Sequence, residues 1–542
     1  MLPTAQNWLD PRPQPRGVAL ASRPSGSPRR LVCFDNGKLS PPYHRWMPIL
    51  PELVAQLERL GHVTVECSDL LSEPVADHAA HVARWQRSGI DGVVFALCDA
   101  GVTLPTVQLA AAAEAGGIPT AIVCTEQVIE VAAVSAGFLA PGLPLLVITG
   151  GRLDGPDQLV AAVAELGSAL RDAISQPAAE LQARFRRSFP FVAALARRPA
   201  STAAEPFAAV AAREFLTDGL PVTEPTRDRV DALLATGDRD PEDRLVMSMA
   251  PSGSPLTVRQ AAICAAMAGC GPECFLLVVA ALRAMAAPEY RLSLASITTY
   301  PGANLLVFSG PAAQAAGVAH GRGCLGPAHR ANLAIGRAVA LTLITVGRAI
   351  PGLSTLCQLG SPGQIACCFA DDPHGPLPPL HTELVSPGDS IVLVQKCESP
   401  HNVLDHLSST PEQLLATVAA VAATVGGNNA YVPSDLIVIL NPEHAEIVAR
   451  AGWRRRDVQQ FLWQEARNER SRLHGRGAKP EWPAEWSALD RVPVAPSPDR
   501  IWVVVAGAPG PHSMVAKPWG YAQAVWQPVH RAAVADRWRG DT

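Results

Sequence analysis

The sequence is poor in lysine, in aromatic residues and in long apolar runs. Only four of its 542 residues are lysine, at positions 38, 396, 479 and 517, although lysine and arginine together number 45. Aromatic residues make up 5%. Charged residues such as Arg283 and Arg337 interrupt the most apolar helical segments before they reach the length of about eighteen residues that a membrane span needs. We therefore expect no membrane span, and the scarcity of lysine by itself indicates no function.

An excess of positive charge is also lacking. Lysine and arginine number 45 against 49 aspartate and glutamate, which gives a net charge of -4, and no dense basic block occurs. Nucleic acid is therefore not expected as a partner. The twelve cysteines are sparse, and several, such as Cys33 and Cys264, lie inside apolar segments. This pattern is typical of buried thiols and argues against a disulfide scaffold.

The first 29 residues lack the charged-then-apolar order of a secretory signal and are instead rich in proline, arginine and serine. We interpret residues 1–29 as a flexible leader on a cytoplasmic protein. The whole chain is 48% hydrophobic, with a mean hydropathy of +0.13, which is enough to build more than one core.

From residue 30 onward, short apolar runs alternate with segments of helical periodicity. The predicted strands cover 31–35, 62–66, 92–97, 119–124 and 143–148. This alternation is typical of βαβ units and predicts a doubly wound α/β domain over residues 30–178. A helical connector is expected over 179–225, followed by a larger α/β domain over 226–542, for which one lobe and two lobes are both left open. Both domains are expected to hold parallel sheets of the Rossmann or flavodoxin-like kind.

The loop after the predicted strand 92–97 contains Cys98 and Asp99 and opens a helix. Free amide groups at a helix start stabilise a thiolate, so Cys98 is a candidate nucleophile. The alternative is an ordinary turn in which Asp99 caps the helix.

The segments Asp91-Gly-Val-Val, Ala100-Gly-Val-Thr, Gly117-Ile-Pro-Thr and Cys124-Thr-Glu, with Asp35-Asn-Gly-Lys upstream, carry a family resemblance. Together they resemble selenoproteins and cysteine homologues with a Sec/Cys-Gly-Ser-Cys motif, which are similar to selenoprotein B of the glycine and betaine reductases. The resemblance covers about residues 30–178 and implies an α/β fold with a cleft at this loop. In that family the two redox residues flank the helix start, and here their positions are Asp99 and Val102. Because neither is a thiol, the resemblance implies a domain that has lost its redox pair.

A second loop, Gly321-Arg-Gly-Cys-Leu-Gly-Pro, precedes a long predicted helix. Its glycines allow close backbone approach, and Cys324 is expected just before the helix N-terminus, with a lowered pKa. Cys324 is therefore a candidate nucleophile, with the helix amides holding an oxyanion or carboxylate. The alternative is a tight turn around an inert buried cysteine.

A third loop, Val505-Ala-Gly-Ala-Pro-Gly-Pro-His-Ser, follows the predicted strand 501–506. It is suited to hold an anion, with His512 supplying a proton. A dinucleotide fingerprint would require a third glycine and a downstream acid, so no cofactor is expected.

A fourth loop places His401 four residues before Asp405, which suits an acid–base pair, a polar turn or half of a metal site. Because no zinc signature is present, no metal is expected.

The leading hypothesis is a non-redox enzyme acting on a small carboxylate, amino-acid-derived or acyl substrate by condensation, cyclisation or elimination. Cys324 is the predicted nucleophile and His401 or His512 the predicted base. The predicted substrate-binding residues are Gly323, Gly326, Arg330, Asn332, Asn402, Gly507, Gly510 and Ser513. Two alternatives stay open: a thiol-dependent reductase that uses Cys98 with Cys124, and a non-catalytic subunit that binds a protein partner. A homo-oligomer is also left open.

Overall fold

A five-stranded parallel sheet forms the centre of the N-terminal domain. The computed structural model describes residues 8–15, 17–23, 28–39, 46–70, 75–150, 155–196, 205–478 and 480–529. The strands are β1 (Arg30–Asp35), β2 (His62–Cys67), β3 (Gly92–Cys98), β4 (Thr120–Thr125) and β5 (Leu145–Ile148). Their order is β2-β1-β3-β4-β5, all parallel, and it reverses between β1 and β3. The doubly wound architecture predicted for this domain is confirmed.

Helices cover both faces of this sheet, which is why β3 and β4 are buried along their whole length. One face carries α1 (Ile49–Glu58), α5 (Pro156–Ala164) and α6 (Gly167–Ser175). The other carries α2 (His78–Arg87), α3 (Thr103–Ala115), α4 (Ile129–Leu139), α7 (Ala178–Ser188) and α8 (Pro190–Ala196). Because Phe185 of α7 and Val192 of α8 belong to this core, the domain continues past residue 178 to the end of α8.

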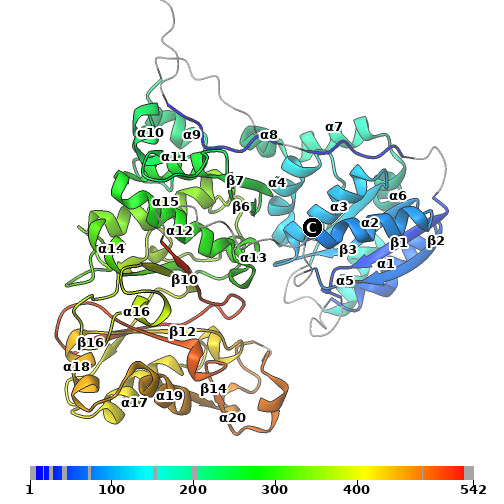
Figure 1. Ribbon diagram of the computed structural model, residues 1–542. Helices are drawn as coiled ribbons and strands as arrows, with labels where there is room; N and C mark the ends of the chain where they lie inside the picture. Colours follow the sequence, from blue (N-terminus) through cyan, green and yellow to red (C-terminus); the bar gives the residue numbers. More distant parts are fainter. Residues whose placement is uncertain are drawn as a thin grey trace, which may run out of the picture.

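The described residues 8–15 and 17–23, which we call the N-terminal strap, pack against both parts of the molecule (Figure 1). Trp8 contacts Phe207 with ring centroids 5.0 Å apart, and Leu20 joins the core of the N-terminal domain. Arg23 and Glu114 form a fully buried ion pair, with nitrogen and oxygen 2.8 Å apart. In contrast to the flexible leader that we expected, this part of residues 1–29 is packed.

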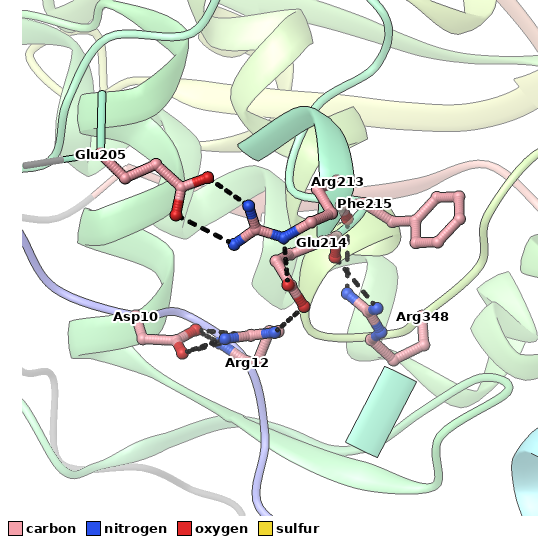
Figure 2. Close-up of polar contacts among 7 residues, drawn as sticks. All are labelled: Asp10, Arg12, Glu205, Arg213, Glu214, Phe215 and Arg348. Carbon is pink, nitrogen blue, oxygen red and sulfur yellow. Dashed lines mark hydrogen bonds and ion pairs between the residues drawn. The ribbon is translucent and has the colours of Figure 1, made fainter. Parts of the chain in front are cut away.

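Polar contacts also hold the strap to α9 (Phe207–Arg213) (Figure 2). The Arg12 guanidinium pairs with Asp10 at 2.6 Å and with Glu214 at 3.1 Å, and Glu214 also accepts a hydrogen bond from Arg213. Nearby, Arg348 is completely buried and donates to the backbone carbonyl groups of Phe215 and Glu214. Burial, reinforced by the positive charge of Arg12, lowers the pKa of Arg348 to about 10.

The C-terminal part contains two four-stranded sheets of mixed direction. The first has the order β17-β10-β8-β9 and the second β11-β16-β12-β15. The first sheet comprises β8 (Ala303–Ser309), β9 (Cys368–Ala370), β10 (Ile391–Cys397) and β17 (Val525–Pro528). The second comprises β11 (His401–Leu404), β12 (Leu436–Leu440), β15 (Ile501–Val505) and β16 (His512–Ala516). The α/β class is confirmed, but β8–β10 and β12–β16 are antiparallel, so the parallel order expected here is restricted to β8–β9 and β12–β15.

The two mixed sheets pack face to face between helical layers (Figure 1). Leu305 and Leu393 of the first sheet and Ile439 and Val504 of the second share one buried apolar cluster. The first sheet is covered by α11 (Val258–Ala268), α12 (Pro272–Ala286) and α15 (Arg330–Thr345). The second is covered by α17 (Pro411–Ala422), α18 (Pro442–Arg450) and α19 (Arg455–Glu465). The result is four layers, in which the two central sheets share one buried apolar cluster.

Shorter elements complete the C-terminal part. They are α10 (Arg227–Leu234), β6 (Arg244–Met249), β7 (Ser254–Thr257), η3 (Pro288–Tyr290), α13 (Leu292–Ser296), α14 (Pro311–Ala315), η4 (Pro362–Gln364), α16 (His381–Leu384), η5 (Asn428–Ala430), β13 (Arg467–Glu469), α20 (Arg470–Leu473), η6 (Ala484–Ala488), β14 (Arg491–Pro493) and η7 (Pro498–Arg500). The hairpin β6–β7 and α13 lie on the side that faces the N-terminal domain (Figure 1).

Candidate functional site

Cys98 is the last residue of β3 and is completely buried. Helix α3 begins only at Thr103, so the thiol belongs to the strand rather than to the helix start. Asp99 lies in the turn, where its carboxylate accepts a hydrogen bond from Thr125 at 3.2 Å. Asp99 and Val102 both lie between the end of β3 and the start of α3, and neither is a thiol.

A second thiol lies beside Cys98. Cys124 of β4 is its partner in the register of the parallel pair and is also completely buried. The hydrogen bond with Cys98, together with burial, raises the pKa of Cys124 well above its usual value. The two thiols are therefore neighbours, but in an environment that disfavours a thiolate.

Cys324 lies in a turn, six residues before α15 begins at Arg330. The expectation that it directly precedes the helix N-terminus is therefore wrong, and Pro327 is not in the first helical turn. Cys324 is 6% exposed and joins the apolar cluster between the two sheets. Burial raises its pKa, and the amide groups of Cys324, Leu325 and Gly507 only partly offset this. The predicted lowering of the Cys324 pKa is therefore wrong, because burial raises this pKa.

The loop of Cys324 does meet the loop after β15. The Gly507 amide donates to the His320 carbonyl at 2.7 Å, and the His320 ring lies 3.5 Å from the Asp372 carboxylate. We call residues 319–326, 371–372 and 505–507 the Cys324 corner. His320, which the sequence analysis did not select, directly precedes the Cys324 loop and contacts both Gly507 and Asp372.

The amide of Asn332 is fully used in holding the Cys324 corner together. Its nitrogen donates to the carbonyls of Ala319, Cys324 and Cys368 at 2.9–3.1 Å, and its oxygen accepts from the Ala319 amide at 2.8 Å. Asn332 therefore fixes backbone rather than presenting a free amide to a substrate. Arg330 donates to a backbone carbonyl at 3.2 Å, and Gly326 donates to the Gly323 carbonyl at 2.7 Å within the turn.

The predicted bases belong to a different edge. His512 lies at the start of β16, where its ring contacts the Asn402 side chain at 2.9 Å. His401 pairs with Val515 at the other end of β11 and is exposed. Within the described ranges, no hydrogen bond joins either histidine to Cys324. The predicted triad of Cys324, His401 and His512 is therefore not assembled as a hydrogen-bonded unit.

Ser513 and Gly510 serve a buried contact that sequence reasoning missed. The Ser513 hydroxyl lies 2.7 Å from the ring of His444, and both residues are only 2% exposed. Asn441 bonds to the Gly510 carbonyl at 2.8 Å and caps α18 through the His444 amide. A polar residue at the end of β12 followed by proline is the only local signal for this arrangement, and it indicates a helix cap.

A similar buried contact joins Ser309, Asp371 and His381. The Ser309 hydroxyl lies 3.0 Å from the Asp371 carboxylate and 2.9 Å from the His381 ring. Asp371 also accepts hydrogen bonds from the amides of Leu380 and Val505. Burial raises the pKa of Asp371, against the effect of these donors. Because serine stands between the acid and the histidine, this set joins β8, β9, β15 and α16 rather than forming a nucleophile–base–acid relay.

A cavity lies between the N-terminal domain and the C-terminal part. It has a volume of about 530 Å³. Gly101, Pro105 and Gln108 contribute the wall from the β3–α3 turn and α3, while β6, α13 and the end of α12 form the opposite wall. Gln108 donates to the Ser248 hydroxyl at 3.0 Å and so bridges the two walls. The cavity therefore adjoins the carboxyl edge of the parallel sheet, where ligands bind in folds of this type.

The charge of this cavity has one sign. Arg239, Arg244, Arg283 and Arg291 line it, and no aspartate or glutamate does. Across the described residues, no carboxylate forms an ion pair or hydrogen bond with Arg239, Arg244 or Arg291. Arg291 has a backbone φ of 50°, in the left-handed region that is unfavourable for a residue with a side chain. These features are typical of a site built for an anion.

A buried lysine lies near the same sheet edge. Lys38 follows β1 and is 7% exposed. Burial lowers its pKa, while the negative charges of Asp99, Glu481 and Asp69 act in the opposite direction. Asp69 precedes Leu70 and Asp99 lies two residues before Gly101, and both Leu70 and Gly101 line the cavity. Asp69 and Asp99 are thus close in sequence to residues of the cavity wall, and Lys38 lies at the same sheet edge. None of the three side chains lines the cavity.

Sequence reasoning missed this cavity because its arginines come from separate elements and follow no motif. The described residues contain no cluster of three or more histidine, cysteine, aspartate or glutamate side chains suited to a metal ion. In the same ranges, no helix has both the length and the apolar character that a membrane crossing requires.

Comparisons of the chain with protein-family models, with curated proteins and with solved structures found no match.

Proposed function

We propose that this protein binds a small organic anion, with carboxylate or phosphate groups, in the cavity between its two parts. The observation that carries the proposal is a cavity of about 530 Å³ with four arginines and no acid in its wall. Cavities of a few hundred Å³ are typical of small-molecule sites. The guanidinium fork matches the geometry of carboxylate and phosphate oxygens.

The rest of the lining suggests the other part of the ligand. Val75, Pro105, Val246 and Met247 contribute apolar surface, and Met247 is 66% exposed. An anion with an apolar or acyl body would cover this surface while its charged groups face the arginines. This agrees with the substrate class predicted from the sequence.

The reaction class stays a prediction. Condensation, cyclisation or elimination of a small carboxylate substrate requires a nucleophile or base near the bound anion. The buried Lys38 and the partly exposed Asp99, at the sheet edge beside the cavity, are better located for this role than Cys324 is. We therefore include enzymatic activity on the bound anion in the proposal. Cys324 is a weaker candidate for the nucleophile or base than Lys38 or Asp99.

The test measures anion binding by isothermal titration calorimetry at low salt, with inorganic phosphate, succinate, citrate and adenosine monophosphate as probes. Because a charge-assisted hydrogen bond contributes about 1.5–3 kcal/mol, Arg244→Gln and Arg291→Gln should each raise the Kd of the best probe about tenfold or more. The control is Arg450→Gln on α18, where the arginine is exposed and paired with Glu446. Affinities that are equal in the parent and both cavity variants contradict the proposal.

A second candidate function is thiol-dependent reduction, and the neighbouring Cys98 and Cys124 favour it. The two thiols would give up two electrons and two protons to an acceptor and form a disulfide. The test is mass spectrometry after incubation with glutathione disulfide, followed by dithiothreitol. A Cys98–Cys124 disulfide that forms and is reversed supports this candidate, and its absence in the folded protein eliminates it.

A further inference from the structure

A second, smaller cavity adjoins the anion cavity between the two parts of the molecule. Arg239 and Arg283 line both cavities. Gln527 lines the anion cavity, and the next residue of β17, Pro528, lines the smaller one. The smaller cavity, which we call the apolar slot, has a volume of about 30 Å³, against about 530 Å³ for the anion cavity. Because the two volumes share the side chains of two arginines, a single ligand is able to occupy both.

Apolar side chains form most of the wall of the slot. One face of α12 contributes positions i, i+1, i+4, i+5 and i+8, which are Phe275, Leu276, Val279, Ala280 and Arg283. The remaining apolar wall comes from the end of α10, the start of α11 and β17, with Leu234, Val258 and Pro528. Asp238 also borders the slot, and it is exposed to solvent. A group that enters the slot therefore meets mainly carbon.

Gly237 and Leu276 lie opposite each other in this wall. A Cβ atom added to Gly237 would lie 3.4 Å from Cδ2 of Leu276, and apart from its chain neighbours no other described atom would lie within 4 Å. The φ angle of Gly237 is not in the left-handed region, so the backbone does not require glycine here. The consequence of glycine at position 237 is thus open space next to Leu276.

Water is a poor occupant of such a slot. A volume of this size accommodates about two water-sized groups, and a mainly apolar wall offers them few hydrogen-bond partners. Replacing this water by an apolar group is favourable. At the junction with the anion cavity, the guanidinium groups of Arg239 and Arg283 suit carboxylate or phosphate oxygens.

We infer that the ligand of the anion cavity has a short, unbranched alkyl or acyl end, which fills the apolar slot while Arg239 and Arg283 hold the adjacent charged group. This inference rests on the proposed function and narrows its substrate class. Gly237 and Leu276 determine the specificity, because the space between them sets the size of the group that fits. Burial of one methylene group should lower the Kd about fourfold, and the slot has room for about two such groups.

The test is isothermal titration calorimetry of the intact protein at low salt. The probes are inorganic phosphate, which has no alkyl group, and the unbranched alkylphosphonates from methyl to hexyl. From methylphosphonate to propylphosphonate the Kd should fall about fifteenfold. From propylphosphonate to hexylphosphonate it should change by less than about threefold, because the slot is already full.

Two variants change the slot in opposite directions. Gly237→Ala places a methyl group against Leu276, so the ratio of the methylphosphonate Kd to the propylphosphonate Kd should fall from about fifteen to about three or less. Leu276→Ala enlarges the slot, so the decrease in Kd should continue to butylphosphonate or pentylphosphonate. The control is Gly388→Ala, at an exposed glycine before β10 where an added Cβ meets no described atom within 4 Å. It should keep the parental ratio.

The possible failures are distinguishable. If phosphate and methylphosphonate bind but the Kd does not depend on chain length, the inference is overturned and the proposed function is retained. The inference is also overturned if Gly237→Ala and Leu276→Ala both keep the parental dependence, because the alkyl group then lies elsewhere. If neither phosphate nor any alkylphosphonate binds, the proposed function fails and the inference fails with it. Should Gly237→Ala not fold, the shift of the preferred chain length in Leu276→Ala decides.

Discussion

The anion cavity and the Cys324 corner differ in how their polar groups are satisfied. In the Cys324 corner, the amide of Asn332 makes four hydrogen bonds and the Asp371 carboxylate accepts three. In the cavity, Arg239, Arg244 and Arg291 have no acidic partner among the described residues. A satisfied network stabilises the fold, whereas unpaired charge around an open volume is available to a ligand. The comparison therefore assigns stability to the corner and binding to the cavity.

The largest effect is expected in the corner, for Asp371→Ala. This change leaves the Ser309 hydroxyl and the amides of Leu380 and Val505 without their common acceptor. The free energy of unfolding should fall by about 3 kcal/mol, measured by urea denaturation. Anion affinity of the folded fraction should stay at the parental value.

The control for Asp371 is its neighbour Asp372, whose side chain has weaker contacts with His320 and with a backbone amide. Asp372→Ala should lower the stability by less than about 1 kcal/mol. Equal losses for the two variants would show that the corner is not held by the Asp371 network.

The opposite behaviour is expected in the cavity, for Arg291→Gly. Glycine relieves the left-handed backbone at φ 50°, so the stability should rise by about 0.5–1 kcal/mol in urea denaturation. Loss of the guanidinium should weaken anion binding about tenfold in calorimetry. A variant that loses stability and keeps its affinity would contradict the assignment of Arg291 to the ligand.

A smaller effect is expected for Cys324→Ala. The sulfur is packed among apolar side chains, so its removal should lower the stability by about 1 kcal/mol in thermal unfolding. Anion affinity should be unchanged. Once a substrate is known, turnover by Cys324→Ala can be measured as well. Loss of turnover with retained binding would identify the thiol as the nucleophile and contradict a purely structural role of the Cys324 corner.

The sequence predicts those features that depend on local periodicity. Apolar runs such as 92–97 predict the strands of the parallel sheet. Their alternation with helices predicts a doubly wound topology, in which the strand order reverses between β1 and β3. The mixed direction of β8–β10 and β12–β16 was not predictable, because a buried antiparallel strand and a buried parallel strand have the same apolar pattern. The packed strap was missed for a related reason, since residues rich in proline and arginine resemble a linker until Glu114 and Phe207 supply their partners.

For the candidate site, glycine, histidine and cysteine at strand ends were weak guides. Gly323 and Gly507 have positive φ values that turns require, which explains them without a ligand. The cavity arginines, by contrast, become neighbours only when α12, α13 and β6 pack together. Local spacing contains no information about that packing.

The smallest effect concerns pH and Asp405, which follows β11 and belongs to neither region of the comparison. Burial alone would raise its pKa, but hydrogen bonds from Ser408 and Thr417 outweigh this and lower it to about 2. A depressed carboxyl pKa stabilises the folded state above the unfolded value of about 3.9, and this stabilisation is lost as the pH falls from about 4 to about 2. Because Asp405 is partly exposed and screened by water, we expect a contribution of about 1 kcal/mol or less.

Asp405→Asn should therefore flatten the pH dependence of the Tm below pH 4, while anion affinity at neutral pH stays unchanged. A pH dependence identical to that of the parent would mean that these hydrogen bonds are not retained in solution.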